Sequence, residues 1–153
     1  MIKFTSKQVL TILISVSVII LIFAVHNIYT TPKKPYIVVS GHKIPLLLAN
    51  DEQSRIQGLS DRPSLEGEKG MLFVFENKAY KSFWMKRMNF PLDIIWIVDN
   101  EIIKIDKNLA PEGDNPTKRY YSGEDVNFVL EVNGGFSDQK NIRVGDTIDY
   151  HLY

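Results

Sequence analysis

The sequence predicts an α+β fold that is mostly β, a small antiparallel barrel or rolled sheet with one short packed helix, preceded by one N-terminal transmembrane helix. Three observations support this prediction. A charge-free apolar segment lies near the N-terminus. About eight short apolar runs separated by turn residues follow it, as in small β domains. One stretch between these runs carries the capping residues of a short helix.

The apolar segment Val9–Val25 contains no charge, and its only polar side chains are Thr11, Ser15 and Ser17. As a helix it would be about 25 Å long, close to the shortest length that crosses a hydrocarbon core of about 30 Å. Backbone groups in lipid need internal partners, so a spanning segment must be helical. We therefore expect the lipid bilayer to be the partner of this segment.

A cleaved signal peptide and a buried core helix are the alternatives to an anchor. A signal peptide ends at a small-x-small site, but here Ile22 lies two positions before Ala24. Lys3 and Lys7 come directly before the span, and the positive-inside rule then favours a cytoplasmic N-terminus. Cleavage in the cell stays open.

These patterns divide the chain into four parts and predict a single-pass protein of the cell membrane. The parts are a cytoplasmic N-terminus at residues 1–8, a transmembrane anchor at 9–25, a linker at 26–35 and an extracytoplasmic domain at 36–153.

The charges are unevenly distributed although the chain has 18 basic and 18 acidic residues. The first 34 residues hold four lysines and no acid, so the rest carries 14 bases, 18 acids and a net charge of −4. This balance argues against a nucleic-acid binder, which needs a concentrated basic surface. The absence of Cys excludes disulfides and thiolate chemistry. With three scattered His, we expect neither a metal nor a cofactor.

The first half of the domain predicts a hairpin and a helix. Strands at Tyr36–Val39 and Lys43–Leu48 flank a turn that contains Gly41. Pro45 places the second strand at an edge or a bulge, because proline cannot donate to a ladder. Asn50 is the expected N-cap of a helix with Gln53 at N3, and Gly58 is expected to end it.

The second half predicts further strands and one long loop. The expected strands are Met71–Phe75, Ser82–Lys86, Asp93–Val98, Glu101–Ile105, Asn127–Asn133 and Thr147–Leu152. Asp99 and Asn100 both tolerate positive φ and predict a tight hairpin. Residues Asp106–Asp125 show no periodicity, and Tyr120 and Tyr121 in this loop either contact a ligand or hold the loop on the barrel.

Polar side chains inside apolar strands are the candidate site. Strand alternation places Trp84 with Lys86, and Glu131 with Asn133. If these faces converge with Asp93, they form one concave surface that suits a polar ligand with apolar faces, such as a glycan or peptide. The alternative is structural: Lys86 pairs with Asp93 or Glu131, and Asn133 caps a turn.

Several sequence blocks in this order closely resemble the uncharacterised family known as domain of unknown function 192. They are Gly58-Leu59, Arg62, Ser64-Leu65, Gly70–Phe75, Ser82–Lys86, Pro91–Ile95, Val129–Phe136 and Val144–Asp146. The resemblance implies a small, mostly β α+β domain that often follows a signal peptide or membrane anchor. It implies no activity, substrate or cofactor. Ser60 replaces the methionine that is common in the family, and Arg87-Met88 replaces Asn-Thr, which adds a positive charge beside Lys86.

The sequence favours a membrane-anchored binding or accessory module of the cell envelope and leaves open whether the protein is an enzyme. One alternative is an envelope hydrolase that uses Asp93 and Glu131 as a carboxylate pair, which would have to face each other across a cleft. Another is a structural subunit of a membrane complex, which would need a large exposed apolar patch.

Overall fold

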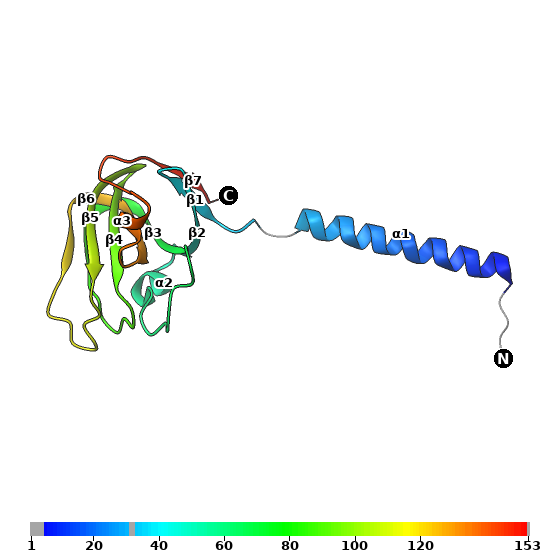
Figure 1. Ribbon diagram of the computed structural model, residues 1–153, viewed down its shortest axis with the longest axis horizontal. Coiled ribbons are helices and arrows are strands. Elements are labelled where there is room, and N and C mark those ends of the chain that lie inside the picture. The colour runs from blue at the N-terminus through cyan, green and yellow to red at the C-terminus, as the bar shows by residue number, and fades with distance from the viewer. Residues whose placement is uncertain (1–4, 31–32, 153) are drawn as a thin grey trace. The chain divides into compact units, whose positions relative to one another are not determined.

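The computed structural model describes residues 5–30 and 33–152, apart from the side chains of residues 27–30, and its described residues form two compact units divided after Lys33. The first unit is the helix α1 (Ser6–Thr30), and the second is a β-rich domain (Figure 1).

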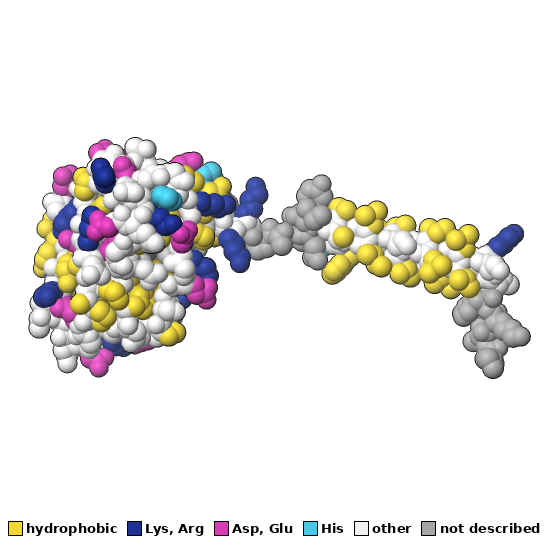
Figure 2. Space-filling model, viewed as in Figure 1, with side chains coloured by type: hydrophobic (Ala, Val, Ile, Leu, Met, Phe, Trp, Pro, Cys, Tyr) yellow, Lys and Arg dark blue, Asp and Glu magenta, His cyan; other side chains and the backbone are white. Residues whose placement is uncertain are grey.

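Helix α1 exposes apolar side chains along its length (Figure 2). Its hydroxyl groups, on Thr11, Ser15 and Ser17, donate to carbonyls three or four residues earlier at 2.8–2.9 Å. The helix therefore satisfies these polar groups internally, as a lipid environment requires. The segment Ser6–His26 is long and apolar enough to cross a membrane, which fits an anchor or a signal sequence.

Seven strands form one sheet in the order β5-β4-β6-β3-β2-β1-β7. Their bounds are β1 (Tyr36–Val39), β2 (His42–Ala49), β3 (Gly70–Phe83), β4 (Leu92–Val98), β5 (Glu101–Leu109), β6 (Tyr120–Asn133) and β7 (Ile148–His151). Neighbouring strands are antiparallel except β2 and β3, which pair in parallel. The predicted mostly antiparallel β fold is confirmed.

The sheet curls into a half-barrel (Figure 1), and the ends of its two edge strands, β5 and β7, are joined at one corner. Glu101 at the start of β5 forms an isolated bridge with Thr147, which directly precedes β7. The Ile102 N–H donates to the Asp146 carbonyl at 3.0 Å, and the Ile148 N–H donates to the Asn100 carbonyl at 2.8 Å. The curl places one face of the sheet inside the roll.

Both predicted hairpins are present. Ser40 and Gly41 turn between β1 and β2 with φ of 49° and 76°, and Asp99 has φ of 55° between β4 and β5. Pro45 pairs with Tyr36 of β1, and the pairing of β2 with β3 begins only at the next residue. The strand β2 is therefore not an edge strand, since it lies between β3 and β1, although Pro45 itself pairs with a neighbouring strand on one side only.

The helix α2 (Glu52–Gln57) begins one residue later than predicted. Its N-cap is Asp51, not Asn50: the Asp51 carboxylate accepts the Ser54 N–H at 2.8 Å, and the Ser54 hydroxyl accepts the Asp51 N–H at 3.2 Å. Both residue types can cap, so the local pattern did not choose between them. Gly58 follows the helix, as expected. A second short helix, α3 (Phe136–Gln139), was not predicted, because four residues are too few for a periodic signal.

Two other predictions are wrong. Ser82–Lys86 is not a separate strand, because β3 runs without interruption from Gly70 to Phe83 and ends before Trp84. Half of the predicted loop Asp106–Asp125 is strand, because β5 continues to Leu109 and β6 begins at Tyr120, and only the residues between these two points are loop. Register shifts between β3 and β6 interrupt the apolar alternation there, which hid these strands in the sequence.

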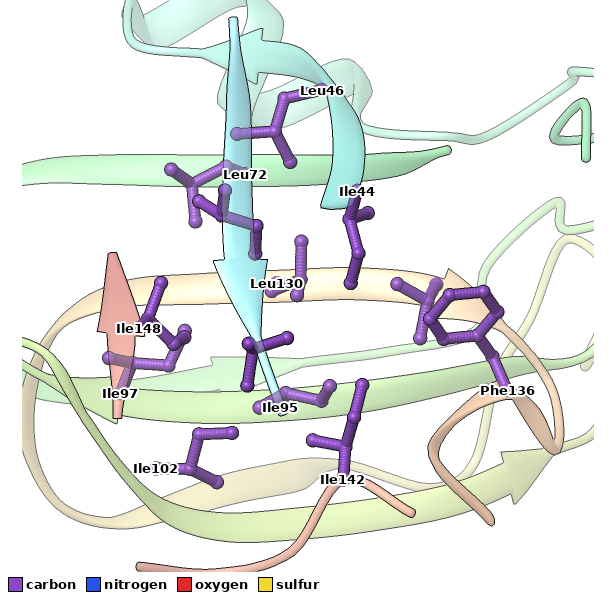
Figure 3. Packing of buried hydrophobic residues seen from close by; sticks show 13 residues of the cluster. Ile44, Leu46, Leu72, Ile95, Ile97, Ile102, Leu130, Phe136, Ile142 and Ile148 are labelled. Atoms are coloured by element: carbon purple, nitrogen blue, oxygen red, sulfur yellow. The ribbon is translucent and has the colours of Figure 1, made fainter. Parts of the chain in front are cut away.

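The two faces of the sheet carry two separate cores. The first core lies inside the roll and is packed by α3 and β7 (Figure 3). It contains Ile37, Val39, Ile44, Leu46, Leu72, Ile95, Ile97, Ile102, Leu130, Val132, Phe136, Ile142 and Ile148. The second core joins the other face to the segments that follow α2 and β3. It contains Ala49, Leu59, Leu65, Met71, Phe73, Met85, Met88, Leu92, Ile94, Trp96, Val126 and Val129.

Candidate functional site

The two buried carboxyl side chains lie on opposite faces of the sheet. In the pairing of β4 with β6, Asp93 is opposite Val132 of the first core, whereas Glu131 is opposite Ile94 of the second core. Because successive side chains of a strand alternate, this one-residue offset separates the two carboxyl groups across the sheet. The predicted carboxylate pair is therefore wrong, and so is the single surface that contained both groups.

Asp93 is a structural residue. Its carboxylate is fully buried and accepts three backbone N–H groups: those of Asn108 at 2.7 Å, Gly135 at 2.9 Å and Ser137 at 2.8 Å. Gly135 and Ser137 begin α3, so the carboxylate fixes this helix against β4 and β5. These three hydrogen bonds explain why a polar side chain is buried at this position, and its full burial closes it to a ligand from solvent.

Glu131 has the opposite environment. The residue is 5% exposed, and its Oε2 atom is buried without a hydrogen-bond partner in the part of the chain that the structure describes. Its neighbours across the sheet, Met71 and Ile94, are apolar. This burial raises the pKa of the Glu131 carboxyl to about 8. At pH 7 burial therefore favours the neutral, protonated form of this group.

Asn133, two residues further along the same face, holds the segment after α2 against the sheet. Its Nδ2 donates to the carbonyls of Leu65 at 2.9 Å and Gly67 at 3.1 Å. The same segment is tied to the one after β3, because Asp61 and Arg87 form an N–H···O bond at 2.8 Å and an ion pair at 2.6 Å. The two segments together cover the second core, so Asn133 has a structural role.

Trp84 and Lys86 lie at the surface, on the segment that follows β3. Trp84 is 40% exposed, while Met85 between the two residues is buried in the second core. The Lys86 Nζ is 5.2 Å from the centre of the Trp84 ring, and the Arg119 guanidinium carbon is 3.9 Å from it. Two cations therefore flank one exposed indole. Arg119 carries no signal in the sequence that would link it to this surface, since only the pairing of β3 with β6 brings it to Trp84.

Two tyrosines continue this surface along β3 and β6. Tyr80 is 57% exposed, Tyr121 is 46% exposed, and their ring centres are 6.0 Å apart. Tyr121 pairs with Ser82, which lies between Tyr80 and Trp84 in the alternation of β3. We call Tyr80, Tyr121 and Trp84 the aromatic strip. Tyr120 points to the other side and packs on the second core, where burial is the main cause that raises its pKa.

The seven predicted site residues thus fall into separate environments. Trp84 and Tyr121 are exposed, and the half-buried Lys86 lies beside Trp84. Glu131, Asn133 and Tyr120 lie on the second-core face, and Asp93 supports α3. Tyr80 was missed because β3 continues past the point where the sequence pattern breaks. The described residues contain no group of three or more His, Asp or Glu side chains that could hold a metal ion.

The fold and surface define a class of protein: a small half-barrel domain with an exposed aromatic strip, in a chain that carries an apolar N-terminal helix. The chain belongs to the family of domain of unknown function 192, described as an uncharacterized ACR, whose model matches residues 36–150. The resemblance drawn from the sequence blocks is therefore confirmed.

Two solved structures share this fold. One, from Sinorhizobium meliloti 1021, is described as a "putative transcription regulator"; it is 31% identical, has a TM-score of 0.71, and the match covers 79% of this chain and 96% of that chain. The other is a protein of unknown function from Novosphingobium aromaticivorans DSM 12444, with 30% identity, a TM-score of 0.68, and coverage of 74% and 83%. No curated protein matches the chain.

Proposed function

We propose that this protein is a membrane-anchored binding module of the cell envelope that recognises a glycan through the aromatic strip. The observation that supports this most directly is the exposure of three large aromatic side chains, Tyr80, Trp84 and Tyr121, along one face of the paired strands β3 and β6. Most large aromatic side chains of the domain are instead buried or half-buried. Trp, Tyr and Arg are also the residues that contribute most of the energy at binding surfaces.

A glycan fits this strip because sugar rings present apolar C–H faces that stack on aromatic rings, together with hydroxyls at their edges. The strip is narrow, and the cations Lys86 and Arg119 flank its Trp84 end. This combination suits a linear polar ligand better than a broad apolar partner surface.

Binding would be tested with the full-length protein in lipid nanodiscs, titrated with neutral and acidic oligosaccharides and with peptides of similar length. Stacking of a ring on an aromatic residue contributes on the order of 1 kcal/mol. Trp84→Ala and Tyr121→Ala should therefore each weaken oligosaccharide binding about five- to tenfold. Ile56→Ala is the matched control, because Ile56 is an exposed apolar residue on α2 that does not belong to the strip. Binding that these strip variants leave unchanged would contradict the proposal, and so would tighter binding of the peptides.

The proposed topology has residues 9–25 in the membrane as an uncleaved anchor, residues 1–8 in the cytoplasm and residues 36–153 outside. It is supported by the apolar helix Ser6–His26 and by the lysines before it. Because the chain has no Cys, a single introduced Cys gives a clean label. A membrane-impermeant maleimide should label Asp114→Cys in intact cells and Ser6→Cys only after permeabilisation. The reverse pattern, or a mature chain lacking residues 1–25, would contradict this topology.

A role in transcription, as named for the Sinorhizobium protein, receives no support from the charge distribution. Residues 35–153 carry 14 bases against 18 acids.

A further inference from the structure

The two ends of the aromatic strip carry opposite charges. Arg119 and Lys86 flank Trp84 at one end. At the other end, Asp125 is the cross-strand partner of Tyr80 and is exposed on the same side of the ladder. A ligand that lies along the strip therefore meets positive charge at Trp84 and negative charge at Tyr80.

The two cations at Trp84 have no acidic partner in the described part of the chain. Lys86 and Arg119 form no ion pair there, whereas Arg87 between them in sequence is paired with Asp61 at 2.6 Å. Two like charges on one indole repel each other, and an anion placed between them relieves that repulsion. Nearby acids, such as Glu112, do not pair with either cation.

Arg119 is preorganised to bind an anion. Its guanidinium lies 3.9 Å from the indole centre, and none of its N–H groups donates a hydrogen bond to a described residue. Stacking on a ring fixes the position of the group and leaves its N–H edges free, which is the geometry that binds a carboxylate with two parallel hydrogen bonds. Lys86 adds a second positive charge, with its Nζ 5.2 Å from the centre of the same ring.

We propose that the Trp84 end of the strip recognises a sugar acid, with the sugar ring stacked on Trp84 and its carboxylate bound by Arg119 and Lys86. This inference rests on the proposed glycan-binding function and names the class of ligand. A uronic acid carries an apolar ring face and a carboxylate on the same residue, so one sugar can make both contacts. Asp125 disfavours a second anion at the Tyr80 end and therefore sets the direction of the chain along the strip.

The test compares oligogalacturonate with its fully methyl-esterified form, which has the same rings without the charge. The full-length protein in nanodiscs of neutral lipid should bind the free acid at least tenfold more tightly at low salt. This preference should shrink as the salt concentration rises, because the charges lie at the surface. Arg119→Gln should weaken binding of the acid about tenfold and change binding of the ester little. Arg119→Lys should give an intermediate loss, because it keeps the charge without the forked donors.

Two matched variants sharpen the result. Lys43→Gln removes a different cation that stacks on an aromatic ring, Tyr36, and should have no effect on either ligand. Asp125→Asn should raise affinity for the acid about twofold through weaker repulsion.

Equal binding of acid and ester would overturn this inference and leave glycan binding intact if Trp84→Ala still weakens both. If Trp84→Ala bound both the acid and the ester as tightly as the wild type, the binding function itself would be refuted. Competition by inorganic phosphate at the same concentration as the sugar acid would reduce the site to a general anion site, and tighter binding of poly-glutamate would reassign it to an acidic peptide.

Discussion

The two faces of the sheet use the same strands but build different interiors. The first core has seven isoleucines and two valines among its 13 residues, whereas the second has one isoleucine, two valines and three methionines among 12. β-branched side chains are stiff, while methionine is flexible and fills irregular gaps. The first core is thus built for rigidity, and the second adapts to the segments that cover it.

The buried carboxyl groups show the same contrast. Asp93, on the first face, accepts three backbone N–H groups, whereas the Glu131 Oε2 atom on the second face has no partner among the described residues. Burial of a carboxyl group alone therefore does not reveal its role. Its hydrogen-bond partners do, because a satisfied carboxylate stabilises the fold while an unsatisfied one costs stability.

The largest expected effect is the loss of the Asp93 carboxylate. Asp93→Ala would leave three N–H groups without their acceptor, among them that of the buried Ser137, and should lower the free energy of unfolding by about 3–5 kcal/mol. Chemical denaturation of the full-length protein in detergent, followed by tryptophan fluorescence, measures this change. Asp93→Asn keeps Oδ1, which accepts two of the three bonds, and should cost less. If Asp93→Ala lowered the free energy of unfolding by less than 1 kcal/mol, Asp93 would not differ from Glu131 in its contribution to stability.

The second prediction concerns the pH dependence that Glu131 causes. The pKa of this group is about 8 in the folded protein against 4.5 for an ordinary Glu, so between these values the folded state binds a proton that the unfolded state lacks. The free energy of unfolding should therefore fall as the pH rises, by about 3 kcal/mol from pH 4.5 to 7, and level off above pH 8.

Glu131→Gln provides the control for this measurement, because it keeps the shape of the side chain without the titration. The variant and the wild type should have similar stability near pH 4.5, and the variant should be more stable at pH 7.5. Denaturation curves of both proteins across this range would show the difference. A wild type that gains stability relative to Glu131→Gln as the pH rises would mean that the carboxylate has a favourable partner.

A smaller loss of stability is expected at Asn133, which holds residues 58–69 over the second core. Asn133→Ala removes the two hydrogen bonds to Leu65 and Gly67 and should cost about 1–2 kcal/mol. Hydrogen exchange should quicken in residues 58–69 and stay unchanged in α3. The control is Asn127→Ala, which loses a bond to the Asp99 turn far from this segment in the chain. If hydrogen exchange became faster throughout the domain, residues 58–69 would not open independently of the rest.

The sequence by itself determined the apolar helix, the two hairpins and the mostly β class. These features depend on local patterns: a charge-free run, residues such as Asp99 that tolerate positive φ, and period-two alternation. It also determined that Phe83 and Met85 share one side of the chain while Trp84 takes the other, because alternation continues for a few residues beyond the end of β3. Which of these sides is buried came only from the structure.

Only the tertiary structure decided which polar residues meet. The register of β4 against β6 separates Asp93 from Glu131 by one residue, which places them on opposite faces, and no local pattern encodes that register. The pairing of β3 with β6 brings Arg119 to Trp84 across 35 positions of sequence. Contacts of this kind depend on long-range strand pairing, and the interrupted alternation of these two strands concealed it from the sequence.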